Sequence, residues 1–338
     1  MSFKPFGCLN VFVASNPKAF DAVDADMISA ALEKLPFRRA SEGSMSYSGW
    51  VSPHMDMSVI AHVAKGNMLM CLKTEEKKIN TSELKERIQI EETRIKKETG
   101  EPRIPKDKRS EIKTKIEAEL LKTAQSKFST IMGWLNFNEK RLIVNVGGMK
   151  QAERFIDMLE RTITLEVPNF AGFTLTPAVP KDDVCFTMTN WLEDKKTVHD
   201  KIELLNDCTI QSPLGADSKK GKIAYSSQAL ESDENLEKYL SKGYSVVNLH
   251  MGFSEQPTEE DSGEFKSATL SLDESFMIKK FKLGACFKDI VKQSDYDSEM
   301  GQFDVEFDAF TTCTDDVLNA MIDIFGGLKP IENETNHF

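Results

Sequence analysis

One segment of this sequence, residues 73–127, is basic within an otherwise acidic chain. It contains 16 Lys or Arg residues and 12 Asp or Glu residues, a net charge of +4. The rest of the chain contains 27 basic and 42 acidic residues, a net charge of −15. Because so highly charged a segment has only narrow apolar stripes to bury, we expect it to lie apart from the main core as a separate basic element.

Local signals in this segment predict a helical hairpin. Asn80 and Glu83 have the spacing of a capping box, so the first helix is expected to start there. Gly100 is placed to end that helix, and two prolines follow it. A second helix is expected to restart near Asp107 or Ser110. Apolar residues form a stripe along each helix, at Leu84, Ile88 and Ile95 and at Ile112, Ile116, Leu120, Ala124 and Phe128. Two antiparallel helices of this kind would project as an arm.

Basic residues concentrate around the expected turn of this arm, residues 100–106. They allow two interpretations. One is a solvated helical face that carries i,i+4 ion pairs such as Glu111–Lys115. The other is an arm that contacts phosphates, because binding a polyanion requires clustered cations rather than a positive charge on the whole protein. The candidate nucleic-acid-binding residues are Lys73, Lys77, Lys78, Arg94, Lys96, Lys97, Arg103, Lys106, Lys108, Arg109, Lys113, Lys115, Lys122 and Lys127.

The remaining sequence predicts an α+β fold in which antiparallel sheets pack against helices. Residues 131–137 and 141–147 are expected to pair as a β-hairpin, as are two strands within residues 267–284. We also expect a helix near residues 199–206 and a strand at 303–312, followed by a helix capped by Thr314. The predicted regions are 1–72 (first α+β region), 73–128 (basic arm), 129–165 (continuation of the first region), 166–183 (a linker rich in Pro, Gly and Thr) and 184–338 (second α+β region).

Two segments, residues 141–163 and 305–327, look alike. Each is expected to give a strand, a turn of small residues and an amphipathic helix. An internal duplication would fit this likeness, with the arm inserted in the first half, although one pair of segments is not a repeat family.

The chain contains 338 residues, enough for two domains or one domain with a large core. No apolar run approaches the roughly 18 to 20 residues that span a bilayer, and no signal peptide is recognisable. Six scattered cysteines without C-x-x-C spacing are typical of a reducing compartment. We therefore expect a cytoplasmic protein that does not bind membranes.

The sequence lacks the motifs of common catalytic sites. It has no P-loop, dinucleotide fingerprint or nucleophile elbow, and its five histidines lie without a second ligand at metal-binding spacing. Asp261, Glu264 and Lys266 supply the residue types of a metal nuclease, as does the triplet at residues 75–77. Such combinations arise by chance in a chain this rich in charge. We expect no catalytic site, no metal and no cofactor.

Several segments together resemble one bacterial family, the recombination-associated protein RdgC. The residues that carry the resemblance are Gly49-Trp50-Val51-Ser52-Pro53 (expected as a turn) and the blocks at 62–79, 128–137, 142–153 and 303–312. The first half of the chain matches almost without gaps, whereas residues 182–297 match loosely. In the arm, the family's A-F-S-R-F-S corresponds to residues 124–129, where Gln125 replaces an aromatic residue.

The resemblance implies a non-enzymatic protein that forms a ring-shaped homodimer around duplex DNA. Such a protein binds DNA without sequence preference, single strands being a further candidate ligand, and restrains RecA-dependent recombination by occupying DNA. It would be associated with the nucleoid. Two other functions stay open: an exonuclease, since distant relatives carry that label, and a regulator that contacts recombination enzymes through its acidic surface.

Overall fold

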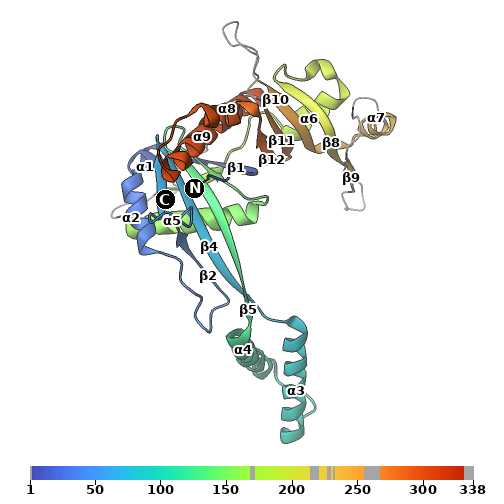
Figure 1. Ribbon diagram of the computed structural model, residues 1–338. Helices are drawn as coiled ribbons and strands as arrows, with labels where there is room; N and C mark the ends of the chain where they lie inside the picture. The colour runs from blue at the N-terminus through green and yellow to red at the C-terminus, as the bar shows by residue number, and fades with distance from the viewer. Residues whose placement is uncertain are drawn as a thin grey trace, which may run out of the picture.

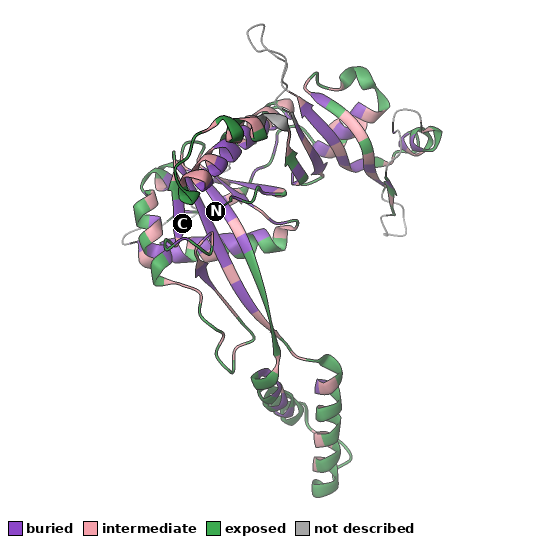
Figure 2. Cartoon of the chain, in the orientation of Figure 1, coloured by how far each residue is buried: buried purple, intermediate pink, exposed green. Residues whose placement is uncertain are grey.

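A computed structural model describes residues 2–167, 172–213, 221–226, 230, 233–254 and 267–330 of the chain. These residues form an α+β body from which a helical arm extends (Figure 1). Buried residues concentrate in the strands and on the inner faces of the body helices, whereas the arm is mostly exposed (Figure 2). The predicted α+β class is therefore confirmed.

Antiparallel strands form the framework of the body. The strands of the first half are β1 (Cys8–Ala14), β2 (Ser46–Val51), β3 (Ala61–Ala64), β4 (Asn67–Lys78), β5 (Gln125–Asn136), β6 (Arg141–Val144) and β7 (Leu175–Pro177). Those of the second half are β8 (Ile202–Gln211), β9 (Lys222–Tyr225), β10 (Ser245–Ser254), β11 (Ser267–Asp273) and β12 (Ile278–Leu283). Both predicted hairpins are present, as the pairs β5–β6 and β11–β12.

Strand β1 joins the two halves into one continuous order, β2-β4-β5-β6-β1-β12-β11-β10-β8-β9, with β3 paired to β4 and β7 to β1. Its first residues, Cys8 and Leu9, pair with β12, while residues 10–13 pair with β6. The second-half strands thus lie at the opposite end of the molecule from the arm (Figure 1).

Helices cover both faces of the first-half strands. The described helices of the body are α1 (Pro17–Asp21), α2 (Ala25–Lys34), α5 (Met149–Glu166), α6 (Val184–Glu193), the 3₁₀ turn η1 (Lys195–Thr197), α7 (Glu234–Leu240), α8 (Ala285–Gln293) and α9 (Glu299–Ile324). On one face, α2 and α5 pack over Met68 and Leu135; a Cβ at Gly133 would come within 2.3 Å of the Phe155 ring. On the other face, Leu69 and Trp134 pack with phenylalanines of α9.

The long strands β4 and β5 form a ribbon that carries the arm, and β3 and β2 border its β4 edge as far as Glu76. They pair from Asn67 opposite Asn136 to Lys78 opposite Gln125, whereas β6 covers β5 only from Gly133 onward. The outer part of the ribbon therefore leaves the body, and the two arm helices follow directly from its end (Figure 1).

The strand predicted at residues 303–312 is wrong, because these residues lie within the 26-residue helix α9. The run F-D-V-E-F-D-A-F alternates like a strand, but Phe303, Phe307 and Phe310 also recur at helical spacing and are buried. Thr314, the predicted helix cap, is buried in the middle of α9, and Ser298 caps the helix instead. Residues 305–327 are therefore almost wholly helical and no longer support an internal duplication.

Two further predictions are corrected. Residues 199–206 do not form a helix: a turn leads into β8, whose pairing with β10 outweighs the polar, helix-like composition of the segment. Gly49 and Trp50 lie in strand β2 rather than in a turn. Gly49 is required there because a Cβ would come within 2.5 Å of the Phe37 backbone. Trp50 is buried, and its indole donates to the Thr162 hydroxyl on α5 at 2.9 Å.

Among the helices of the described residues, none is long and apolar enough to cross a membrane. The division of the chain into five regions stays a prediction. Helix α5 ends at Glu166, at the start of the predicted linker, and residues 168–171 of that linker lie outside the described residues.

Candidate nucleic-acid interface

The arm consists of two helices, as predicted: α3 (Thr81–Thr99) and α4 (Lys106–Thr123). The predicted stripe of the second helix extends too far, because α4 ends before Ala124 and Phe128 lies in strand β5. The Asn80 side chain caps α3 by accepting from the backbone N–H of Ser82 at 2.9 Å. Gly100 ends α3 in the left-handed conformation, with φ of 70°, which glycine adopts without steric cost. Helix α4 starts at Lys106, one residue before the predicted restart at Asp107. The turn between the helices is residues 100–105.

The two arm helices share a small apolar core of their own. Leu84 of α3 packs with Ile112, Ile116 and Leu120 of α4, and four half-buried isoleucines surround them. This cluster is separate from the two larger clusters of the body. The arm is therefore an element whose helices stabilise each other rather than pack on the sheet.

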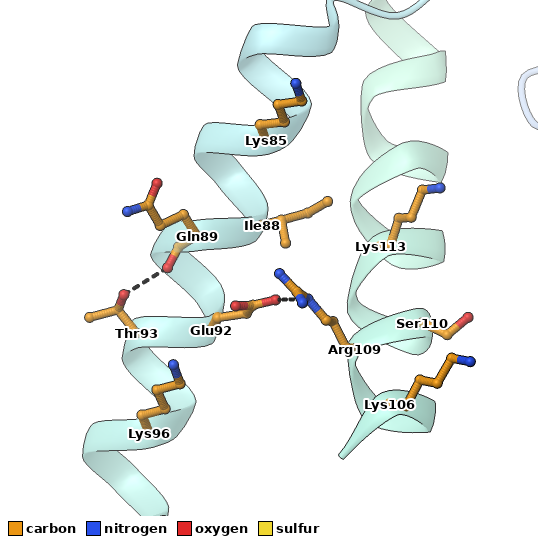
Figure 3. A pocket seen from close by; sticks show the side chains of 10 residues that line it. All are labelled: Lys85, Ile88, Gln89, Glu92, Thr93, Lys96, Lys106, Arg109, Ser110 and Lys113. Carbon is orange, nitrogen blue, oxygen red and sulfur yellow. Dashed lines mark hydrogen bonds and ion pairs between the residues drawn. The ribbon is translucent and has the colours of Figure 1, made fainter. Parts of the chain in front are cut away.

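A groove of about 760 Å³ runs between α3 and α4 (Figure 3). Ile88 lies between the helices, and Arg109 reaches across to Glu92, with Nε and Oε1 at 2.5 Å. The residues that line the groove are Lys85, Ile88, Gln89, Glu92, Thr93 and Lys96 from α3 and Lys106, Arg109, Ser110 and Lys113 from α4. Five of these ten side chains are cationic and one is acidic.

Two of the cations outside the groove form ion pairs with acids on the same helix. Arg94 pairs with Glu91 at 2.6 Å and with Glu98 at 3.0 Å, and Arg87 pairs with Glu83 at 2.7 Å. These are the i,i+3 and i,i+4 pairs that the solvated-face interpretation requires. The pair expected between Glu111 and Lys115 does not form within the described part of the chain. Outside the groove, the part of the arm around Arg87 and Arg94 thus resembles a solvated helical face.

The fourteen predicted residues are distributed over four elements and a turn. Lys73, Lys77 and Lys78 lie on β4; Arg94, Lys96 and Lys97 on α3; Arg103 in the turn; Lys106, Lys108, Arg109, Lys113, Lys115 and Lys122 on α4; and Lys127 on β5. The structure brings four of them together in the groove: Lys96, Lys106, Arg109 and Lys113. Lys85 completes the groove and was not predicted. Its spacing from Ile88 and Lys96 places it on the same helical face, and that signal would have identified it.

Some predicted cations have structural roles at the base of the arm. The Lys73 ammonium lies 5.0 Å from the ring centre of Phe37 and 5.4 Å from that of Phe128, as cation–π contacts. Lys77 donates to the Ser41 carbonyl at 2.8 Å. Both side chains thus hold the preceding segment of the chain against the ribbon.

A buried carboxylate also holds this segment. Glu75 is 2% exposed and accepts from the Ser126 hydroxyl at 2.5 Å and from the Ala40 backbone N–H at 2.8 Å. These hydrogen bonds, the one from Ser126 foremost, lower the pKa of Glu75, and Arg39 at 3.5 Å adds to the effect. Glu75 is therefore a structural anion that fastens the residue 38–44 loop to the base of the arm.

The residue triplet at 75–77 does not converge on a common point. Glu75 faces Ala40 and Ser126, Glu76 pairs with Arg154 at 2.6 Å, and Lys77 faces a backbone carbonyl. Among the described residues, no group of three or more His, Cys, Asp or Glu is placed to hold a metal ion. The other nuclease-like set, Asp261, Glu264 and Lys266, lies outside the described residues.

Comparison of the sequence with known proteins points to one family. Residues 6–328 match a family model described as "RdgC: Putative exonuclease, RdgC". A "Recombination-associated protein RdgC" of Psychromonas ingrahamii is 25% identical over 305 residues, covering 90% of this chain and 93% of that protein. Proteins of the same name from Proteus mirabilis and Halorhodospira halophila are each 25% identical, covering 90% and 92% of this chain and 94% of each relative.

Proposed function

The chain belongs to the RdgC family, and we propose that it is a sequence-nonspecific DNA-binding protein that restrains RecA-dependent recombination. In this proposal two copies form a ring around duplex DNA, and the protein acts by occupying DNA rather than by cutting it. Relatives that cover nearly the whole chain are named for an association with recombination. DNA is the substrate of recombination, so a DNA-binding role fits that name.

The observation that carries the proposal is the placement of unpaired cations on the arm. Among the ion pairs of the arm within the described residues, none involves Lys85, Lys96 or Lys106, although acids are abundant on both helices. Lysines that are left unpaired and exposed are available to displace counterions from a phosphate backbone. Contacts of this kind are made to the backbone and not to base edges, so they supply affinity without sequence preference.

We expect the affinity for duplex DNA to be independent of sequence and strongly dependent on salt. Fluorescence anisotropy with labelled duplexes of unrelated sequence should give dissociation constants that agree within a few-fold at each salt concentration. The logarithm of the binding constant should fall linearly with the logarithm of the salt concentration, by about 0.9 for each phosphate contact. Binding that is independent of salt, or confined to one sequence, would contradict the proposal.

The same samples distinguish this function from exonuclease activity, which the family description names. End-labelled duplex incubated with the protein and Mg²⁺ or Mn²⁺ should stay full length. Degradation that depends on the protein and is lost in Glu264→Ala would favour the nuclease. Addition of the protein to a RecA strand-exchange reaction should slow product formation at concentrations that saturate the DNA.

We expect the protein to be a dimer in solution. A ring made from two copies closes through two contacts related by twofold symmetry. Light scattering should therefore give twice the 38.1 kDa mass of the chain at micromolar concentration. A mass equal to one chain throughout a concentration series would exclude the ring and leave DNA binding by single copies.

A further inference from the structure

The groove between α3 and α4 accounts for the whole net positive charge of the arm segment. Residues 73–127 contain 16 basic and 12 acidic residues, and five of those basic residues and one acidic residue line the groove. The rest of the segment contains eleven basic and eleven acidic residues and is therefore electrically neutral. A net charge of +4 therefore lies on one face of the hairpin.

Without a bound ligand, this concentration of like charge in the groove destabilises the arm. On α4 the cations Lys106, Arg109 and Lys113 follow one another at i, i+3 and i+7, a spacing at which like charges repel. Only Arg109 has a close partner, Glu92, since the contact of Lys113 with Glu117 is 3.6 Å long. Elsewhere on the hairpin, acids at the same spacing relieve such repulsion. An anionic ligand in the groove would relieve it here.

The spread of the cations favours a polyanion over a single phosphate. Lys85 and Lys96 are eleven residues apart on α3, which corresponds to about 16 Å along the helix axis. No single phosphate reaches cations this far apart, whereas a nucleic-acid strand carries a phosphate on every nucleotide and presents several of them over that length.

We propose that this groove is the phosphate-binding site of the arm and follows the backbone of one DNA strand. Phosphates of that strand are contacted by Lys85, Lys96, Lys106 and Lys113. Arg109 is held in place by Glu92. Arg94, Arg103 and the cations on the outer faces of the hairpin are not part of this site. The inference rests on the proposed function, since it names the surface through which DNA is held.

Two variants with equal charge test the site. The groove variant is Lys85→Gln, Lys96→Gln, Lys106→Gln and Lys113→Gln. The control variant is Lys97→Gln, Lys108→Gln, Lys115→Gln and Lys122→Gln, four exposed lysines of the same helices that do not line the groove. Each variant lowers the net charge by four. Both leave Arg109 and the apolar core of the arm unchanged, so circular dichroism should match that of the wild type. The melting temperature should be equal or, for the groove variant, slightly higher because the repulsion is relieved.

Binding of a random 30-base-pair duplex is measured for both variants between 50 and 200 mM salt. Because the groove variant can no longer neutralise four phosphates, its slope of log K against log[salt] should fall by about 3.6, and that of the control by less than about 1. If the slope falls equally in both variants, the groove is not the phosphate-binding site, and the proposal of nonspecific DNA binding is unaffected. A wild type without salt-dependent DNA binding would overturn the proposed function itself. If the groove variant keeps its DNA affinity but no longer binds polyglutamate, the ligand is an acidic peptide and the inference is wrong.

Discussion

Replacing residues 79–124 by the dipeptide Asn-Gly is expected to remove most of the affinity for DNA. Lys78 and Gln125 pair with each other at the end of the β4–β5 ribbon, so a two-residue turn joins them as an ordinary β-hairpin. The excision deletes the four lysines that are proposed to contact phosphates. At about 0.9 for each contact, the salt slope should fall by about 3.6, and affinity near 0.1 M salt should fall on the order of 10³-fold or more.

Net charge alone predicts a much smaller effect. The excised residues comprise twelve basic and ten acidic side chains, so the net charge of the chain changes only from −11 to −13. A protein that binds DNA through diffuse charge should therefore lose little affinity. Anisotropy titrations of the excised and full-length proteins decide between the two outcomes, and light scattering of both shows whether a change in oligomeric state contributes.

The body should keep its fold in the excised protein. Leu84, Ile112, Ile116 and Leu120 pack with each other and with isoleucines of the arm, so excision removes this apolar cluster whole and exposes no core of the body. We expect a melting temperature within a few degrees of the wild type by calorimetry. A large drop would mean that the ribbon depends on the arm, and the loss of DNA affinity would then have a structural explanation.

The sequence predicts the arm well because its signals are local. The Asn80 cap, the glycine at position 100 and the apolar stripe each lie within a few residues of the feature that they specify. Helices that pack only on each other need no information from distant parts of the chain. For this reason the bounds of α3 can be predicted to the residue, whereas those of strands in the body cannot.

The errors in the body arise where long-range pairing decides the structure. Residues 303–312 fit a strand and a helix equally in their short-range pattern, and only packing against the sheet and the N-terminal phenylalanines selects the helix. Gly49 and Trp50 have the composition of a turn, because the sequence does not show that β4 lies beside them. Such information is distributed over residues far apart in the chain.

The candidate site is predictable in composition but not in geometry. A count of cations along the arm shows no difference between Arg94, which is neutralised by two glutamates, and Lys96, which has no ion-pair partner among the described residues. The two residues differ because they lie on different faces of α3: Lys96 lines the groove and Arg94 does not. Lys85 lies outside the predicted set because the density of cations is highest near the turn, whereas the groove extends along the hairpin toward the body.

The second large effect is expected at the largely buried ion pair that fastens α9 to the sheet. Arg141, at the start of β6, is 3% exposed and donates to Asp315 of α9 and, at 2.8 Å, to the side-chain oxygen of Asn319. Asn136 donates to the other oxygen of Asp315 at 2.6 Å. Arg141→Met leaves a carboxylate that is only 18% exposed without its counterion, which should cost up to about 3–5 kcal/mol in the free energy of unfolding near pH 8.

The pH dependence of that loss identifies its cause. Burial raises the pKa of Asp315, and Arg141 opposes the rise, so the pKa should rise further in Arg141→Met. A group whose pKa is raised by folding favours the folded state most at low pH, and this advantage is lost as the pH rises through the folded-state pKa. Urea denaturation should therefore show that Arg141→Met loses more unfolding free energy, relative to the wild type, at pH 8 than at pH 5.

Adding Asp315→Asn to Arg141→Met removes the unpaired charge, so the double variant should recover much of its stability at pH 8 and lose the excess pH dependence. If the deficit is the same at both pH values, or if the double variant is no more stable than Arg141→Met, the loss comes from packing around Arg141 rather than from an unpaired carboxylate.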